Sequence, residues 1–301
     1  MSGTGHSPLE AAILRDGAIE SVEPAEISAA LDAESAATRQ RGARACTLLA
    51  ETDVDSVRPF VAELGRALAD ENPGVVQSAA SALVETATAD VDAVTGVVSD
   101  VAVPIQSDLG GVQLAAAQLL RAVASEEPSH CVPVADALLD RLGRPPAADS
   151  DEQSATVAID DRVTRRTVRQ HEQEERQHER VARQIFADVA VAVAEAEPPA
   201  FADRVETLAE LVAGDDVVAR GAGLDILGSL CRDDPATVEA AEDAVVACLD
   251  ADAPVLRARA VRTLGFLGDG EYAAVLRECA AAESDDEIAA FAAETAAFLD
   301  E

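Results

Sequence analysis

The stretch DADAPVLRARAVRTLGFLG, residues 250–268, holds the pattern that decides the fold. Leu256 is followed four residues later by a small residue, Ala260, and eight residues later by Leu264. Residues spaced by four lie on one face of an α-helix, so this stretch predicts a helix with a single apolar face. The small residue in the middle of that face would let a second helix approach closely.

The same pattern occurs seven times along the chain. Successive copies begin 37, 37, 69, 37, 38 and 32 residues apart, and a near-constant period of this length is the signature of a solenoid built from helix pairs. We therefore predict an all-α fold, an α-solenoid of about seven helix pairs. The clear copies are Val75-Ala79-Leu83, Val112-Ala116-Leu120, Val218-Ala222-Ile226 and Leu256-Ala260-Leu264, and the weaker ones are Thr38-Gly42-Cys46, Val181-Ile185-Val189 and Ile288-Ala292-Ala296.

Each copy is predicted to begin the second helix of its pair. Asn72 is placed to cap one such helix, with Pro73 at its first position, and Ser284 has capping-box spacing to Glu287. The glycines at 110–111 are predicted to start another. The second helices are expected at residues 38–51, 74–87, 111–124, 163–196, 217–230, 254–267 and 287–299.

Residues 250–265 resemble the HEAT-repeat family, including its shorter lyase-like subclass. The match consists of an acidic turn ending in Pro254, an apolar–Arg pair at Leu256 and Arg257, then Ala and Leu-Gly. Residues 215–228 fit too, except that Ala219 stands where the Arg is expected. The resemblance covers roughly residues 23–300 apart from one interruption. It implies an armadillo-like architecture whose second helices line a concave groove, and it specifies architecture rather than activity.

The 69-residue step marks the interruption and divides one continuous solenoid into residues 1–142, 143–180 and 181–301. Residues 143–160 are rich in Pro, Asp and Ser and predict a loop. A helix from about residue 161 to 196 follows. Its first half has almost no apolar residue between Val168 and Val181, so we expect it to project into solvent.

This projecting half is also a charge-balanced island in an acidic chain. Seven arginines and six acidic residues lie between Asp160 and Arg183. Such interspersed charges favour pairing of residues 162–180 with a second copy or a client helix, while an isolated, solvated helix stays open as the alternative. The island includes Arg165, Arg169, His171, Arg176, His178 and Arg180.

Charge is the second informative feature of the chain. There are 57 acidic residues against 23 arginines and no lysine, which gives a net charge of −34, yet 49% of residues are hydrophobic. In this the chain resembles the cytoplasmic proteins of haloarchaea, in whose molar salt the Debye length falls to about 3 Å and self-repulsion is screened. An acidic chain from a GC-rich mesophile is the alternative. We favour the halophilic interpretation because GC bias does not explain the excess of Asp and Glu.

The acidity argues against nucleic-acid binding and against anionic membrane surfaces. No apolar stretch is long enough to span a bilayer, and the first residues lack the basic and apolar regions of a signal peptide. We therefore expect a cytoplasmic protein.

The sequence offers little catalytic chemistry. The five cysteines are widely spaced with no CxxC, which indicates neither a disulfide framework nor a zinc site. Two His-Glu dipeptides begin at His171 and His178, and a HEAT-repeat enzyme, deoxyhypusine hydroxylase, holds two irons through such dipeptides. Its dipeptides come from separate repeats, whereas both lie here on one helix, which cannot close a metal site alone. We predict no metal, no cofactor and no catalytic residue.

Arginine placement gives the strongest binding signal. The predicted second helices hold 14 arginines and 11 acidic residues in 117 residues, and the other 184 hold 9 and 46. The family resemblance thus implies a groove that bears arginines, which suit carboxylates and phosphates. The groove candidates are Arg41, Arg44, Arg121, Arg259 and Arg262, for which ligand-facing and merely solvated positions both stay open.

HEAT arrays also use arginines as an internal ladder to the turns of neighbouring repeats. The resemblance therefore implies that Arg220 and Arg257 pair with Asp215, Asp216 or Asp250. We expect a non-catalytic adaptor or scaffold that holds a protein client in the concave groove. The alternative is a lyase-like or hydroxylase-like enzyme or enzyme subunit, and nucleic-acid binding through the groove is the least favoured of the three.

Overall fold

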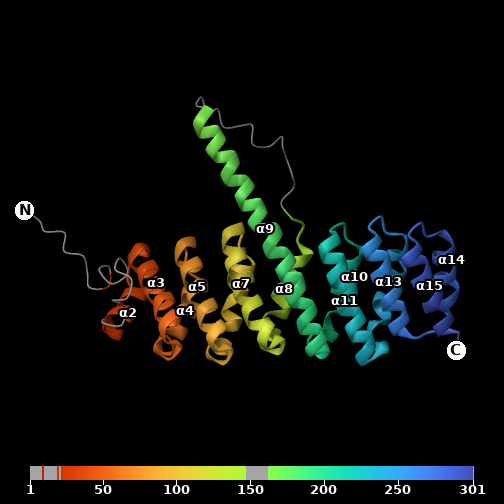
Figure 1. Cartoon of the computed structure of the whole chain (residues 1–301), viewed down its shortest axis with the longest axis horizontal. Coiled ribbons are helices and arrows are strands. Elements are labelled where there is room, and N and C mark those ends of the chain that lie inside the picture. Colours follow the sequence, from red (N-terminus) through yellow and green to blue (C-terminus); the bar gives the residue numbers. More distant parts are fainter. Residues whose placement is uncertain (1–8, 10–18, 20–21, 147–161, 301) are drawn as a thin grey trace, which may run out of the picture. The chain divides into compact units, whose positions relative to one another are not determined.

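The computed structural model describes residues 9, 19, 22–146 and 162–300 (Figure 1). Within residues 162–300, side chains are described from residue 168 onward. It divides into two compact units. Unit 1 comprises residues 1–137 and 146–185, and unit 2 comprises residues 138–145 and 186–301. All regular structure in the described ranges is helical, without a strand. Both units are stacks of helix pairs, which confirms the predicted all-α solenoid fold.

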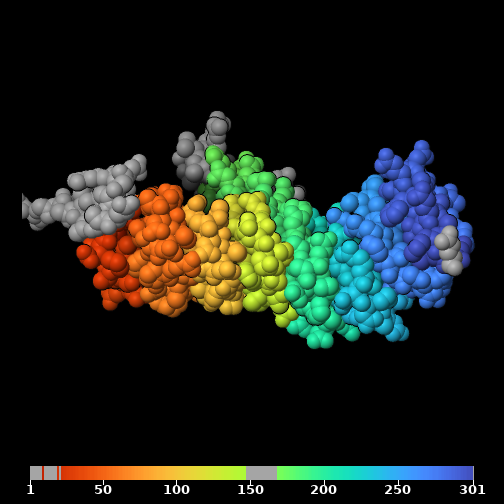
Figure 2. Space-filling view, turned by 60° about the horizontal axis from the view of Figure 1, so that its bottom comes forward, coloured from red at the N-terminus to blue at the C-terminus, as the bar shows by residue number. Residues whose placement is uncertain are grey.

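Unit 1 holds the N-terminal pairs. The space-filling view shows the atoms of successive pairs of this unit abutting in chain order, from red through orange to yellow (Figure 2). The pairs are α2 (Pro24–Leu31) with α3 (Ala36–Thr52); η2 (Val54–Ser56), η3 (Arg58–Phe60) and α4 (Val61–Ala67) with α5 (Pro73–Ala89); and η4 (Val91–Val101) and α6 (Ala102–Ile105) with α7 (Gly110–Glu126). They are followed by η5 (Pro128–Val134), the start of α8 (Ala135–Gly143) and the first part of α9 (Arg162–Ala196).

Unit 2 begins with the remaining parts of α8 and α9. Its pairs are η7 (Pro198–Arg204) and α10 (Val205–Ala213) with α11 (Val217–Asp233); η8 (Pro235–Ala241), α12 (Glu242–Ala247) and η9 (Cys248–Asp250) with α13 (Pro254–Leu267); and α14 (Tyr272–Ala282) with α15 (Asp286–Leu299). With α8 and α9 in the place of the interrupted copy, the helices described correspond to the seven or so pairs that the sequence pattern predicts.

Second helices stack on one another within each unit, and the small residues lie at their contacts. In unit 1, α3 contacts α5 and α5 contacts α7; in unit 2, α11 contacts α13 and α13 contacts α15. Ala79, Ala116 and Ala260 are completely buried at 0% exposure, as is Ala292. Since a larger side chain would hold the helices apart, the predicted role of these alanines in close packing fits their burial.

The repeat register needs one correction, in α11. In α3, α5, α7, α13 and α15 the first residue of the repeated pattern lies three positions after the N-cap residue, whereas Val218 lies only two after Asp216. The equivalent triplet in α11 is therefore Ala219-Gly223-Leu227, one residue later than predicted. Arg220 then takes the position that Arg257 has in α13, four residues after the N-cap.

The helix N-caps lie where the sequence predicts them, with one exception. Asn72 accepts a hydrogen bond from the Gly74 N–H at 3.0 Å, as predicted. The cap of α15 is Asp285 rather than Ser284, since its Oδ1 accepts from the N–H groups of Glu287 and Ile288 at 3.0 and 3.3 Å. A carboxylate at this position also opposes the positive end of the helix dipole.

The long helix α9 runs for 35 residues. Its first half projects past α7 (Figure 1), and most side chains from Val168 to Glu174 are exposed, as expected. From Ala182 onward it is a core helix, with Phe186 fully buried. The predicted loop at 143–160 falls outside the described residues from 147 onward.

Candidate functional site

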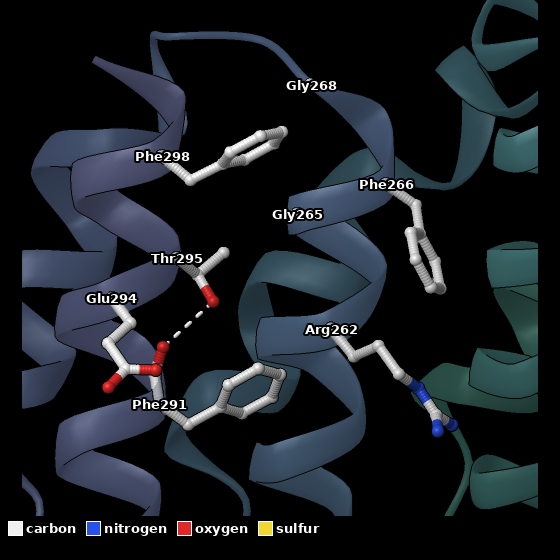
Figure 3. A pocket seen from close by; sticks show the side chains of 8 residues that line it. All are labelled: Arg262, Gly265, Phe266, Gly268, Phe291, Glu294, Thr295 and Phe298. Atoms are coloured by element: carbon white, nitrogen blue, oxygen red, sulfur yellow. Dashed lines mark hydrogen bonds between the residues drawn. The ribbon is translucent and has the colours of Figure 1, made fainter. Parts of the chain in front are cut away.

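Helices α13 and α15 of unit 2 form a pocket of about 670 Å³ (Figure 3). The lining residues of α15 are spaced by three and four, so they form one face of that helix, and those of α13 do the same. The pocket is lined by Arg262, Gly265, Phe266, Gly268, Phe291, Glu294, Thr295 and Phe298.

Three exposed phenylalanines line this pocket: the rings of Phe291 and Phe298 lie on the α15 side, and the ring of Phe266 is turned toward α11 (Figure 3). Phe266, Phe291 and Phe298 are 36%, 38% and 65% exposed. The other three phenylalanines of the chain are at most 2% exposed: Phe60, Phe186 and Phe201. Large apolar side chains gathered at one exposed place mark an interaction site, whereas single exposed ones need no explanation. This pocket is therefore the described region with the clearest sign of binding.

A close approach of the two helices makes the floor of the pocket. A Cβ at Gly265 would lie 2.9 Å from Thr295 Cγ2, so glycine lets α15 come near α13. The Thr295 hydroxyl donates to the Phe291 carbonyl oxygen at 2.8 Å and so is satisfied within its own helix (Figure 3). Gly268 ends α13 with φ of 71°, a left-handed conformation that glycine adopts without strain.

The arginines near the pocket interact with the Asp225 carboxylate or with the Phe266 ring. Asp225, on α11, pairs with both Arg259, at 3.3 Å, and Arg262. A Cβ at Gly221 would collide with the Arg259 guanidinium, so this glycine makes room for it. Arg232 lies over the Phe266 ring at 5.1 Å, within cation–π range. Two of the predicted groove arginines therefore tie α11 to α13 beside the pocket.

The other three predicted groove arginines belong to unit 1. Arg44 and Arg121 are exposed, on α3 and α7, and Arg41 is half-buried on α3. In unit 1, the exposed positions of α5 and α7 are mostly polar and small, and no aromatic residue is among the exposed large apolar side chains described there. The arginine signal alone thus did not identify the pocket.

An arginine ladder is present, but its acceptors differ from those implied by the family resemblance. Arg257 makes a bidentate pair with Glu283, at 2.6 and 2.8 Å, and donates to the carbonyl oxygens of Ala251 and Asp252. In unit 1 Arg39, which the sequence ladder did not include, makes the same set of bonds, with Asp70 at 2.6 and 2.8 Å. Each carboxylate also accepts a hydrogen bond from the N–H of the next N-cap residue.

Arg220 occupies the same position but finds other acceptors. Its Nε donates to the Val212 carbonyl oxygen at 3.0 Å and its Nη2 lies 3.3 Å from Cys248 Sγ. The residue two before the next N-cap, which is acidic in the two pairs above, is here Ala251. Asp216 caps α11 by accepting from the Val218 N–H at 3.2 Å, and neither Asp215 nor Asp250 is the acceptor of Arg220 or Arg257.

The ladder shifts the acidity of its carboxylates. Hydrogen bonds from Arg257 lower the pKa of Glu283 from 4.5 to about 2, helped by the backbone N–H groups of Asp285 and Ser284. Hydrogen bonding to Arg39 likewise lowers the pKa of Asp70, and burial opposes that shift. Both carboxylates are charged at neutral pH and bound within the fold, so the ladder is structural.

The charged half of α9 is anchored to unit 1 at one place. Glu175 Oε2 accepts a hydrogen bond from the Gly111 N–H at 3.3 Å, at the start of α7. The N-cap residue of α7 is Leu109, whose apolar side chain cannot accept such a bond. A Cβ at Gly110 would collide with the Glu175 carbonyl oxygen, so the two helices touch here through backbone. His178 Nδ1 lies 4.0 Å from Glu175 Oε1. The helix thus projects beyond a specific anchor.

The remaining predicted residues of this helix lie around that anchor. Arg169, His171 and Arg180 are exposed and Arg176 is half-buried, while the Arg165 side chain lies outside the described residues.

Other chemistry is limited in the described part of the chain. Burial raises the pKa of the Cys46, Cys131 and Cys231 thiols to about 12, which makes them poor nucleophiles. Among the described residues no cluster of three His, Cys, Asp or Glu side chains is arranged to hold a metal ion. None of the helices described has the length and apolarity needed to cross a bilayer.

Comparison with known proteins gives structural similarities only. No family model and no curated protein matches the sequence. Among solved structures, an engineered protein is similar at 19% identity and a TM-score of 0.46, over 82% of this chain and 99% of its own. A designed armadillo repeat protein is similar at 12% identity and a TM-score of 0.47, over 81% of this chain and 100% of its own.

Proposed function

We propose that this chain is a non-catalytic adaptor or scaffold that binds a protein client through the pocket between α13 and α15. The observation that carries the proposal is the exposure of Phe266, Phe291 and Phe298 around one cavity. Aromatic side chains in a concave, partly desolvated place are typical of the residues that dominate protein interfaces. The pocket lies on second helices, the face on which HEAT-like repeats would bind.

The charge supports a setting of high salt. With a net charge of −34, screening is needed to hold the acidic helix pairs together, and molar salt also removes long-range steering of a client. Binding in such a medium depends on apolar burial and on short ionic contacts. An aromatic pocket flanked by charges meets both needs. We place this adaptor in a salt-rich cytoplasm.

Site-specific photo-crosslinking tests the function. A benzophenone amino acid placed at Phe298 should crosslink a defined client in an extract of the source cell at its native salt concentration. The same group at Val103, which is 55% exposed in unit 1, is the matched control. A client band that appears at both positions, or at neither, would contradict binding at the pocket.

Self-association through residues 162–180 remains a separate proposal. It is supported by the charge balance of this segment and by the exposure of Arg169, His171 and Arg180. Deleting residues 145–178 with a short linker removes nearly all of this segment. A lower oligomeric mass in high salt supports self-association, and an unchanged mass refutes it.

A further inference from the structure

The exposed face of α15 alternates acidic and aromatic side chains. Glu287, Phe291, Glu294 and Phe298 follow one another at intervals of four, three and four residues, and all are exposed. Such spacing places them along one stripe of the helix, with a charge and a ring on successive turns. The stripe is continuous with the pocket, because its last three members line the cavity.

The two acidic side chains of this stripe have no ionic partner in the part of the chain that the structure describes. Within the described residues, neither Glu287 nor Glu294 takes part in an ion pair. The arginines near the pocket are different, because Arg259 and Arg262 share Asp225, and Arg232 lies over the Phe266 ring. A partner therefore meets, along this stripe, two carboxylates without an ion pair to a described residue, one on either side of Phe291.

We propose that the pocket binds a helical segment of another protein that carries large apolar side chains on one face and Arg or Lys beside them. This inference rests on the proposed function and names the chemistry of the client. An amphipathic helix in a groove places apolar anchors at i, i+3 or i+4, and i+7, which matches the spacing of the pocket residues. Phe291 and Phe298 are seven residues apart, about 10 Å along the helix, so roughly three turns of a client would cover them.

Charge also decides against the two rival occupants. A second copy of this chain carries the same net charge of −34, so its surface is poorly matched to the Glu-Phe stripe. A nucleic acid would place phosphates against Glu287 and Glu294, where like charges repel. Basic side chains instead form short ion pairs there, and a short contact survives in high salt better than long-range attraction does.

Helical peptides of known sequence test the inference on the full chain. The probe is a fluorescent 18-residue peptide with leucines at i, i+4, i+7 and i+11 and arginines flanking that face. The second probe replaces each arginine with glutamate, and the third keeps the arginines but scrambles the leucines. Fluorescence anisotropy is measured in about 1 M and about 3 M KCl, with circular dichroism confirming that every variant is folded.

We expect the arginine peptide to bind more tightly than both other probes. The double variant Phe291→Ala/Phe298→Ala should weaken it about tenfold or more, and Glu287→Gln/Glu294→Gln about fivefold in 1 M KCl, with a smaller loss in 3 M. Val255→Ala and Glu278→Gln remove an exposed valine and an exposed glutamate elsewhere in unit 2, and should change nothing. Equal binding of the glutamate peptide, or equal binding by the pocket variants, would overturn the inference.

The occupant and the function fail in different ways. If Phe298 crosslinks a client while the arginine peptide is no better than the glutamate peptide, the adaptor function stands and the basic-helix chemistry is refuted. If sedimentation shows a dimer that Phe298→Ala dissociates, a second copy occupies the pocket, which also refutes it. If neither a client crosslinks nor a peptide binds, the proposed function itself fails.

Discussion

The two units build their helix pairs alike and differ in the face they expose. In unit 1 the exposed stripe of α5 reads Gln77, Ser81, Glu85 and Thr88, all small or polar. In unit 2 the exposed stripe of α15 reads Glu287, Phe291, Glu294 and Phe298. The buried faces of both helices are made mostly of alanine and aliphatic residues, with a few Ser and Thr side chains. Stacking constrains only the buried face, so the aromatic residues on the exposed face of unit 2 carry information about binding.

The ladder shows what the units share. Arg39 in unit 1 and Arg257 in unit 2 lie four residues after their N-caps, and each bridges its own preceding turn and the carboxylate of the next pair. Where the next turn lacks that carboxylate, as at Ala251, Arg220 turns to a carbonyl oxygen and a thiol. Each step of the ladder therefore needs an arginine and a carboxylate that lies 26 or 31 positions later in the chain.

The largest expected effect separates the units by charge. Unit 2 has 27 acidic residues and 9 arginines in 124 residues, and unit 1 has 30 and 14 in 177, so unit 2 is the more densely negative. We expect helical structure to be lost below a few tenths molar KCl, because screening no longer offsets self-repulsion. Hydrogen exchange during dialysis should show α11, α13 and α15 opening before α3 and α5. An unchanged circular dichroism spectrum in dilute buffer would refute the halophilic interpretation.

A smaller effect, on stability alone, tests whether the two units pack alike. Ala260→Leu in α13 and Ala79→Leu in α5 each place a large side chain at a fully buried contact between second helices. Each should lower the free energy of unfolding by roughly 1–3 kcal/mol through overpacking. Urea titration in constant high salt measures the change.

The control for this pair is Ala293→Leu, at an exposed position of α15. It should change the free energy of unfolding by less than about 0.5 kcal/mol. A neutral Ala260→Leu would mean that Ala260 does not lie at a close contact between second helices and that the repeat register is wrong. A neutral Ala79→Leu alone would mean that the units differ in packing as well as in surface.

The sequence predicted the buried faces of the helices better than their exposed faces. The period of small and aliphatic residues predicted the seven pairs, because burial against neighbours on both sides enforces it along the chain. It misplaced α11 by one residue, since Ala219, Ala222, Gly223 and Ile226 are all buried and fit either register. Arg220, four residues after the N-cap, was the signal that would have resolved it.

The site was harder to predict than the fold. The pocket residues come from two helices whose exposed sides obey no repeat, and arginine counts drew attention to residues that Asp225 holds inside the fold. A usable signal was present in the aromatic residues. The chain has six phenylalanines, and Phe266, Phe291 and Phe298 fall off the repeated apolar positions.

The next effect concerns the anchor of α9, which has no counterpart described in unit 2. Gly110→Ala places a methyl group against the Glu175 backbone, and should cost about 1 kcal/mol, the low end of overpacking, because the projecting half of α9 can shift away. Limited proteolysis should then cut α9 before residue 180 faster than in the parent protein. Gly96→Ala, where a Cβ meets nothing within 4 Å, is the control. Equal cleavage rates in the parent and Gly110→Ala proteins would show that the backbone contact does not restrain the helix.

The smallest expected effect is the pH dependence of the ladder in unit 2. The pKa of Glu283 is lowered from 4.5 to about 2 by its hydrogen bonds with Arg257, so the pair stabilises the fold fully above pH about 4.5. That stabilisation is lost as the pH falls toward 2, because protonation removes the charge that Arg257 binds. In Arg257→Gln the pKa of Glu283 should return toward 4.5. The difference in urea midpoint between parent and variant should therefore be largest above pH 4.5 and should shrink toward pH 2, at constant high salt.

Arg277→Gln, which breaks an exposed pair with Asp300, is the matched control and should show a much weaker trend, since solvent screens that pair. A difference between parent and Arg257→Gln that stays constant from pH 6 to pH 2 would mean that Arg257 stabilises unit 2 through its bonds to the Ala251 and Asp252 carbonyl oxygens, and not through Glu283.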